Sequence, residues 1–272
     1  MLIWIVILVV TVVALYLIGL AVGFGAYGAA QRARVTEAQY DASEPVDLDL
    51  IPQIMRDFAL RNGGTVGGPP VFEAIQQAEL RTGPKAPFFP LRARQTLGTR
   101  APAIAWMARG IMPPGIPVSG LDCYVAGAGD FEIRLFGTIP VATASDAAAA
   151  VGELMRHLSE LPIYPDAILN CTGLSWHQLN DRQVEVTAQS NFGPASVTFS
   201  FDDAGDIVGL TAERPRDTGH HQSVLTPWLG RYSDYRSFGA YRLPVHGEVG
   251  WQLPDGYFVY WRGDLVSLEA GA

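Results

Sequence analysis

The sequence of 272 residues is poor in lysine and in cysteine. It contains one lysine, Lys85, two cysteines, Cys123 and Cys171, and a formal net charge of −8. Such an acidic chain lacks the basic surface that binds nucleic acid, so we expect no nucleic-acid partner. Two cysteines without metal-ligand spacing leave open whether they form a disulfide or remain buried thiols.

Catalytic and cofactor signatures are also missing. The sequence has no Walker A motif, no zincin helix and no EF-hand loop. "TGLSWH" places Ser175 after a glycine but lacks the second glycine of a nucleophile elbow. "GFGAYG", residues 23–28, matches the dinucleotide fingerprint literally, yet no strand precedes it and it lies in an apolar run. We therefore predict no cofactor and no metal.

Charged side chains are absent from Met1 to Gln31. A helix of that length extends about 45 Å, more than the roughly 30 Å of a bilayer core. Trp4 and Tyr27 are spaced to suit the two interfacial belts. The run has no basic n-region and exceeds a signal-peptide core, so residues 1–30 are predicted to anchor the chain in the lipid bilayer. A signal peptide cleaved near residues 28–30 is the alternative.

Two features bear on how such an anchor would sit in the membrane. Arg32 and Arg34 follow the span, and by the positive-inside rule they favour a cytoplasmic soluble part on a single-pass protein of the cytoplasmic (inner) membrane. Gly19 and Gly23 form a GxxxG spacing that could bring two spans together as a homodimer.

Beyond the anchor, residues 31–50 are expected to form a polar juxtamembrane linker and residues 51–272 a single β-rich domain. Helices are predicted near 51–62, 70–82 and 146–161 from capping and breaker residues. Most of the rest alternates with period two between tight turns, which gives about nine or ten strands. Consecutive hairpins favour an α+β fold in which a curved antiparallel half-barrel packs on a few helices.

The stretch "RHLSELPIYPDAIL" ends the strongest predicted helix. At 100° per residue, Glu153, Arg156, His157 and Glu160 share one helical face, and Arg156 is spaced to pair with either glutamate. The favoured interpretation is an ion-paired structural face exposed to solvent. The alternative is that Glu160 is a general acid/base of a hydrolase or isomerase, with His157 as its helper.

Tryptophans at alternating strand positions raise the question of a cavity. They fit either a large filled core or a curved sheet that lines an apolar cavity with Trp106, Trp176 and Trp251. The loop "RPRDTGHH" adds Arg214 and Arg216, which could hold a carboxylate or phosphate headgroup. A metal site at its two histidines is less favoured, because no third ligand lies at a recognisable spacing.

One pattern runs through the helix and the segment after it. The residues that carry it are Leu154, Arg156, Leu158, Glu160, Pro165, Ala167 and Leu169, with His157 at a tyrosine position. They resemble the L-x-R-[YH]-L-x-E…P-x-A-[IL]-L hallmark of an uncharacterised bacterial family, a domain of unknown function. Strand tryptophans and the Pro227-Trp228 pair extend the resemblance from about residue 70 to the C-terminus. It implies a fold similar to lipoprotein-carrier half-barrels, with an apolar concave face.

These observations predict a membrane-anchored binding module that holds a lipid or another apolar ligand in the half-barrel. Arg156 and Glu160 are expected to brace the ligand site, and the helix near 146–161 to serve as its lid or plug. Besides the enzyme alternative, the chain could be a structural partner in a membrane complex, with Gly19 and Gly23 at the contact.

Overall fold

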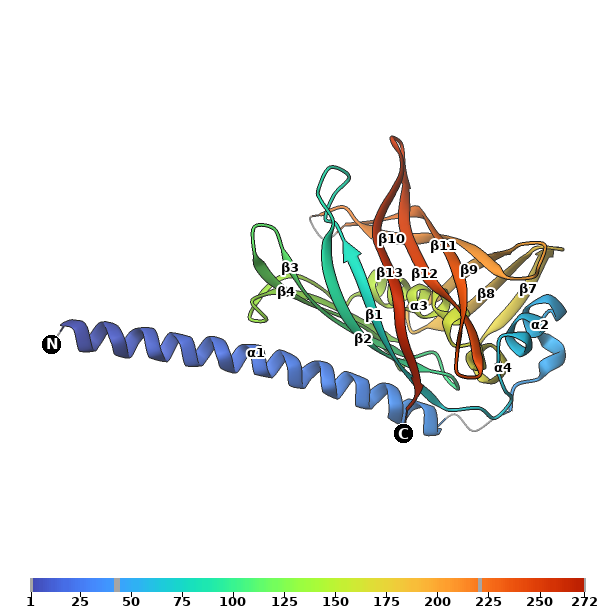
Figure 1. Ribbon diagram of the computed structural model, residues 1–272, viewed down its shortest axis with the longest axis horizontal. Coiled ribbons are helices and arrows are strands. Elements are labelled where there is room, and N and C mark those ends of the chain that lie inside the picture. Colours follow the sequence, from blue (N-terminus) through green and yellow to red (C-terminus); the bar gives the residue numbers. More distant parts are fainter. Residues whose placement is uncertain (1, 42–44, 220–221, 272) are drawn as a thin grey trace.

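The computed structural model describes residues 2–41, 45–219 and 222–271. Within them lie four α-helices, two 3-10 turns and thirteen strands (Figure 1). The helical elements are α1 (Leu2–Asp41), η1 (Leu48–Leu50), α2 (Gln53–Arg61), α3 (Ala147–Ser159), η2 (Leu161–Ile163) and α4 (Asp166–Asn170). The strands are β1 (Val71–Leu80), β2 (Phe89–Gly98), β3 (Ile104–Met112), β4 (Ile116–Val125), β5 (Ala128–Leu135), β6 (Ile139–Ala144), β7 (Ser175–Asn180), β8 (Gln183–Ser190), β9 (Gly193–Phe201), β10 (Ile207–Asp217), β11 (Ser223–Phe238), β12 (Tyr241–Leu253) and β13 (Gly256–Ala270).

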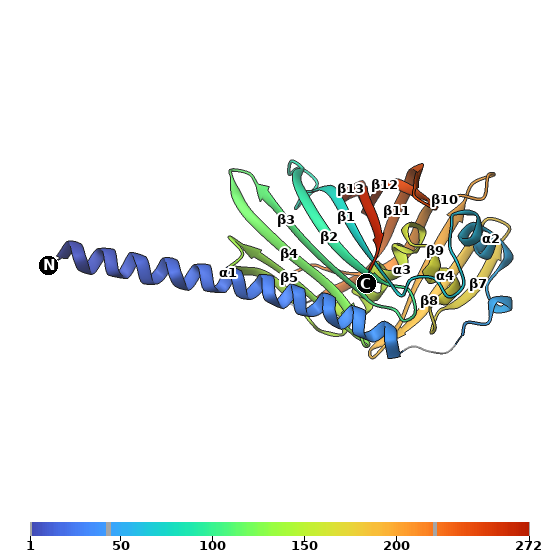
Figure 2. The ribbon, with the colours of Figure 1, turned by 60° about the horizontal axis from the view of Figure 1, so that its bottom comes forward.

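All the strands of the described chain belong to one antiparallel sheet, in the order β6-β5-β4-β3-β2-β1-β13-β12-β11-β10-β9-β8-β7. The chain starts in the middle, runs out to the β6 edge, crosses through α3 to the β7 edge, and returns strand by strand to β13. Pairing of β1 with β13 joins the two halves. The sheet curls around α3 (Figure 2), which confirms the predicted α+β half-barrel.

The predicted helix at 70–82 is wrong, because that segment is strand β1. Its sequence, "VFEAIQQAEL", is rich in helix formers, and its inward positions after Phe72 are Ala74, Gln76 and Ala78. Gln76 is buried because it accepts a hydrogen bond from the Trp106 indole at 3.0 Å. Tertiary pairing with β2 and β13 therefore overrides the local helix propensity.

The sheet also has more strands than the nine or ten expected. Strand β11, "SVLTPWLGRYSDYRSF", carries many polar residues, so alternation alone does not identify it as a strand. It is the longest strand described and pairs along most of its length with β10 and β12. Many of its polar side chains point to solvent, whereas Trp228 is buried.

Helix α3 begins where the Asp146 carboxylate accepts a hydrogen bond from the Ala149 amide at 2.9 Å. It lies inside the concave face, with Leu154 and Leu158 fully buried in the main core. The expected solvent-exposed face is wrong: Glu153 and His157 are 5% and 0% exposed. Sheet covers the helix on both flanks, since α3 contacts strands of both halves.

The described chain contains no disulfide. Cys123 and Cys171 are free, buried thiols in separate clusters, Cys123 under α1 and Cys171 in the main core. This answers the question that their spacing left open.

Helix α1 has two parts. Its N-terminal part extends away from the domain with its side chains exposed, and its C-terminal part packs on the outer face of β2, β3 and β4 (Figures 1 and 2). The buried stripe follows a helical period: Phe24, Gly28, Gln31, Val35 and Gln39. Residues 31–41, expected as linker, are thus helical and part of the domain, while 42–44 lie outside the described residues.

Polar contacts fix this packing. The Gln39 side-chain oxygen accepts hydrogen bonds from the amides of Arg100 and Ala101 at 2.8 and 3.0 Å. Tyr27 donates a hydrogen bond to the Asp130 carboxylate on β5. The C-terminal part of α1 is therefore held rigidly against the half-barrel.

By length and composition α1 could cross a membrane, which fits a single-pass anchor or a signal sequence. Gly23 to Gly28, the literal dinucleotide fingerprint, are helical throughout. Gly19 and Gly23 are exposed and touch nothing within 4 Å of an added Cβ, so a homodimer through them stays a prediction.

Gly28 tests how closely α1 must approach the sheet. A Cβ there would overlap the Met107 side chain, whereas a Cβ on Gly23 would meet nothing within 4 Å. We expect Gly28→Leu to lower the stability of the domain by about 1–3 kcal/mol through overpacking, and Gly23→Leu to leave it unchanged. Thermal unfolding of the full chain in detergent measures both; equal melting temperatures would contradict the observed packing.

Candidate functional site

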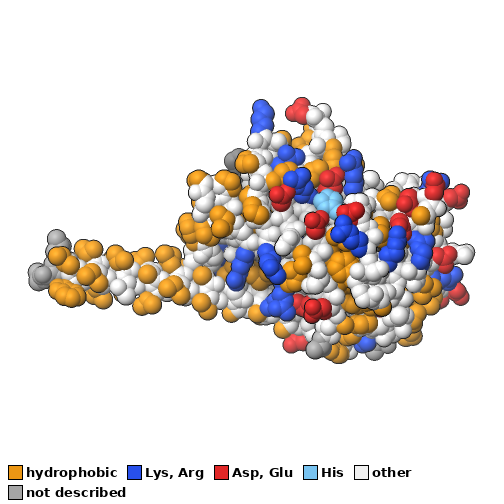
Figure 3. All heavy atoms as spheres, in the orientation of Figure 1, with side chains coloured by type: hydrophobic (Ala, Val, Ile, Leu, Met, Phe, Trp, Pro, Cys, Tyr) orange, Lys and Arg blue, Asp and Glu red, His pale blue; other side chains and the backbone are white. Residues whose placement is uncertain are grey.

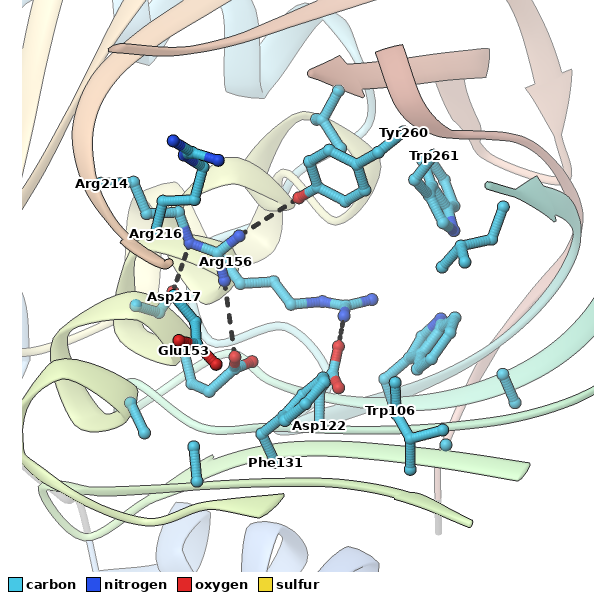
Figure 4. A pocket seen from close by; sticks show the side chains of 18 of the residues that line it. Trp106, Asp122, Phe131, Glu153, Arg156, Arg214, Arg216, Asp217, Tyr260 and Trp261 are labelled. Carbon is cyan, nitrogen blue, oxygen red and sulfur yellow. Dashed lines mark hydrogen bonds and ion pairs between the residues drawn. The ribbon is translucent and has the colours of Figure 1, made fainter. Parts of the chain in front are cut away.

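A cavity of about 700 Å³ lies between α3 and the concave face of the sheet (Figure 4). Strands of both halves and α3 form its walls. Its apolar lining includes Leu80, Phe89, Leu91, Trp106, Ala108, Met112, Val118, Phe131, Ile133, Leu135, Val141, Trp228, Val249, Trp251 and Trp261. Its polar lining includes Asp122, Glu153, Arg156, Ser159, Glu160, Arg214, Arg216, Asp217 and Tyr260.

Arg156 is the central cation of this polar group. Its guanidinium forms an ion pair with Asp122 on β4 and lies 3.9 Å from a Glu160 oxygen. It also lies over the Trp106 ring, 4.5 Å from the ring centroid. Both partners of the Asp122 pair are largely buried, at 15% and 11% exposed. The contact therefore attaches α3 to the first half of the sheet.

Arg214 makes the equivalent attachment to the second half. From β10 it donates to the Gly152 carbonyl at 3.1 Å and approaches a Glu153 carboxylate oxygen at 3.4 Å. Another of its nitrogens donates to the Tyr260 hydroxyl at 3.2 Å, and that hydroxyl also accepts from the Trp228 indole. Tyr260 stacks on Trp251, with 5.8 Å between centroids.

Burial governs the protonation of these groups. It raises the pKa of Glu153 to about 7, although the charge of Arg214 acts to lower it. It also raises the pKa of Glu160, against the influence of Arg156, and lowers the pKa of Arg156 to about 10. Two polar atoms near the cavity, Oε2 of Glu153 and Nε1 of Trp261, have no hydrogen-bond partner among the described residues.

Six of the seven residues predicted to contact a ligand line this cavity: Trp106, Trp251, Arg156, Glu160, Arg214 and Arg216. Trp176, the seventh, is not among the residues that line it. Trp176 lies on β7, at the far edge of the sheet, where it is partly buried against the main core. A strand tryptophan does not reveal from sequence which part of a curled sheet carries it.

His157 does not face the cavity either. It is fully buried beside Tyr164, whose hydroxyl lies 3.0 Å from Nδ1 of the histidine. Burial lowers the pKa of His157 to about 3, so its ring is neutral across the physiological range. His157 therefore does not lie beside Glu160 as the expected helper, and no histidine lines the cavity among the described residues. His220 and His221, considered as metal ligands, lie outside the described residues.

Sequence reasoning missed Asp122 and Tyr260 at this site. Asp122 lies on β4 directly before Cys123 in a strand of apolar residues, and a buried acid in such a strand does signal a buried cation. Tyr260 lies among the aromatic residues of β13, and its sequence position gives no sign that its hydroxyl bonds to Arg214 and Trp228. That role depends on β10 and β13 facing the same space, which spacing does not reveal.

The Arg156–Asp122 pair should be important for stability. Arg156→Leu would leave a buried carboxylate without its cation, and we expect it to cost about 3–5 kcal/mol of unfolding free energy. The matched control is Arg231→Leu, whose ion pair with Glu248 is exposed and is expected to be worth about 1 kcal/mol or less. Chemical denaturation of the full chain compares them; similar losses would contradict a bracing role.

The raised pKa of Glu153 predicts a pH dependence. Its unfolded pKa is about 4.3, so between about 4.3 and 7 the folded state holds the extra proton. The stability that the protonated Glu153 carboxyl contributes is fully present below about pH 4.3 and is lost as the pH rises through about 7. Melting temperatures across this range should therefore fall less steeply in Glu153→Gln than in the unmodified chain; parallel curves would contradict this assignment.

Comparison with known proteins gives a family and several similar structures. A family model described as "Family of unknown function (DUF6544)" matches residues 41–263. No curated protein matches the sequence.

Three crystal structures are similar in fold at low sequence identity. A putative outer membrane lipoprotein-sorting protein domain from Vibrio parahaemolyticus is 11% identical, with a TM-score of 0.47, over 80% of this chain and 90% of that one. A LolA superfamily protein from Nitrosomonas europaea is 9% identical, with a TM-score of 0.45, over 82% and 94%. A DUF1329 family protein from Desulfovibrio piger is 8% identical, with a TM-score of 0.44, over 85% and 95%.

The family match covers most of the chain, including the helix hallmark, both halves of the sheet and the whole polar group of the cavity. The predicted resemblance to a family without known function is thereby confirmed. The chain belongs to the family of unknown function DUF6544.

Proposed function

We propose that this protein is a membrane-anchored binding module that holds the apolar part of a lipid in its half-barrel cavity. The observation that carries the proposal is the cavity itself. Its volume of about 700 Å³ falls within the range of about 300–1,000 Å³ of small-molecule sites. Apolar side chains from both halves of the sheet line it, with charged groups along α3, as expected for an amphipathic ligand.

The arrangement of charges keeps this cavity open. Arg156 of α3 is paired with Asp122 of β4, and Arg214 of β10 is paired with Glu153 of α3, so both cations are held by buried partners and neither is free to move into the apolar space. A sheet that collapsed onto the helix would have to desolvate these groups further, at a large cost. This supports a binding cavity over the filled core that the aromatic strands also allowed.

Arg216 is the best candidate for contact with a polar headgroup. It lines the cavity, and its Nε donates to the Thr226 hydroxyl at 3.4 Å. Among the described residues, no carboxylate lies within ion-pair distance of Arg216, whereas Arg156 and Arg214 are already paired. A phosphate or carboxylate headgroup would suit such a guanidinium.

The enzyme alternative has less support. Glu160 lines the cavity with a raised pKa, as a general acid needs. Its expected helper, His157, is bonded to Tyr164 outside the cavity. The nearest charged group to Glu160 is Arg156, which acts to lower the pKa of this carboxyl, whereas burial raises it. A carboxyl buried for structural reasons shows the same raised pKa without catalysis.

The proposal predicts bound lipid. The full chain, purified in detergent and extracted into organic solvent, should carry a defined lipid in mass spectrometry at about one molecule per chain. Gly120→Leu should lower that occupancy, because Gly120 lines the cavity and a Cβ there meets only ordinary contacts. Its control is Gly83→Leu, which adds the same atoms to the β1–β2 loop, where a Cβ meets nothing within 4 Å.

The outcomes separate the hypotheses. Lipid that is retained by Gly83→Leu and lost by Gly120→Leu, with unchanged melting temperatures, supports the cavity as its site. Lipid that is lost from neither variant would be annular lipid around α1, and a folded chain without defined lipid would overturn the proposal.

A further inference from the structure

Two neighbouring hairpins that contribute to the cavity wall carry exposed apolar side chains. On the β3–β4 hairpin these are Ile111, at 59% exposed, and the adjacent prolines 113 and 114. On the β5–β6 hairpin they are Phe136, Ile139 and Val141, each at least half exposed. The two tips are joined, because the Phe136 amide donates to the Pro117 carbonyl at 2.8 Å. Together these residues form one patch, which we term the apolar rim.

The apolar rim continues into the cavity. Met112, Val118, Leu135 and Val141 lie on the same two hairpins and line the cavity. A molecule resting on the rim is therefore next to the cavity's apolar wall.

The rim also lies against α1. A side-chain carbon placed on Gly137 would be 3.3 Å from the Cβ of Ala21, so the β5–β6 turn touches the helix at that residue. In Figure 3 hydrophobic side chains cover α1 and continue onto the part of the domain nearest to it, over the β3–β4 hairpin. The rim and the helix thus form a continuous apolar surface.

The length of α1 places this contact at a membrane interface. The 18 residues from Ile3 to Leu20 are helical and largely exposed, and they extend about 27 Å at 1.5 Å per residue. That is close to the roughly 30 Å of a bilayer core. If these residues span the bilayer, Ala21 and the β5–β6 turn lie where the hydrocarbon ends.

Two arginines lie next to the apolar rim, about one turn of α1 further toward the C-terminal end of that helix. Arg134 lies over the Phe24 ring at 4.6 Å, and a side-chain carbon on Gly25 would lie 3.7 Å from an Arg109 nitrogen. These cations occupy the next turn of α1 beyond Ala21, which is the level of lipid headgroups. Apolar tips followed by arginines are typical of segments that rest in a membrane interface.

Phe136 itself lacks a folding reason for its position. It is 55% exposed and has a positive φ of 54°, a backbone conformation that bulky residues rarely adopt. Such a residue is unfavourable for the isolated domain both in its backbone and in its contact with water. Contact with lipid would remove the second disadvantage.

We propose that the apolar rim inserts into the surface of the same bilayer that α1 spans, so that the cavity opens directly to the membrane. Its occupant would be a lipid drawn laterally from that leaflet. The inference rests on the proposed lipid-binding function and adds the route by which the ligand enters. The rigid packing of residues 24–39 of α1 on the sheet holds the domain in this orientation.

The test measures depth in the membrane. Phe136→Cys in the full chain is labelled with an environment-sensitive fluorophore and reconstituted into phosphatidylcholine–phosphatidylglycerol vesicles. Phe192→Cys is the matched control, because Phe192 is 56% exposed and lies at the β8–β9 turn. Cys123 and Cys171 are buried, and labelling of the unmodified chain measures their background.

We expect the label at residue 136 to shift its emission to the blue and to lose fluorescence when the vesicles contain spin-labelled lipid, and the label at residue 192 to do neither. Equal emission and equal quenching at the two sites would overturn membrane docking, as would a chain that does not reconstitute into vesicles. Bound lipid with an unquenched residue 136 would reject the docking and leave the binding function standing. A quenched residue 136 on a chain without cavity lipid would support the docking and reject the binding function.

Discussion

The buried ion pair between Arg156 and Asp122 determines much of this structure. It attaches α3 to the first half of the sheet, while the Glu153 contact with Arg214 and the Tyr232 hydrogen bond to the Ser159 carbonyl attach the same helix to the second half. Because α3 is also the crossover between the two edge strands, its position controls the curl of the whole sheet. A buried charge that loses its partner is costly, so the curled state is strongly preferred.

The same constraint explains why the concave face is hollow. A helix with an entirely apolar surface could be enclosed completely by a contracting sheet. Here one side of α3 carries Leu154 and Leu158 into the main core, and the other carries Glu153, Arg156 and Glu160 toward the tryptophans of the cavity. Arg156 lies over Trp106 and Arg214 over Trp228, and these aromatic and charged side chains together line a space of about 700 Å³. That combination suits a ligand with an apolar chain and a charged end.

Most of the architecture could be predicted from the sequence, and the failures have physical causes. Alternation between tight turns revealed the antiparallel half-barrel, because period two is a local property. Strand β1 was mistaken for a helix because its inward residues are alanines and a glutamine, whose burial depends on Trp106 of β3. Trp106 and Trp251 were distinguishable from Trp176 only once the strand order was known.

The candidate site was predictable in its residues and less so in its contacts. Arg156 and Glu160 stood out by their helical spacing, yet the main partner of Arg156 is Asp122, which is 34 residues away in sequence and visible only after the sheet has curled. Likewise, apolar composition indicated a membrane span, but only the packing of Gly28 and Val35 shows that α1 continues as part of the domain.

The central claim is that the space between α3 and the sheet holds a lipid chain, and photo-crosslinking tests it most directly. The full chain, reconstituted with phospholipid that carries a diazirine near the end of one acyl chain, is irradiated and digested, and the modified residues are identified by mass spectrometry. The account predicts crosslinks on the cavity wall, at Trp106, Ala108 and Trp251 and their neighbours. Crosslinks confined to residues 3–20 of α1, with none on the cavity wall, would contradict it.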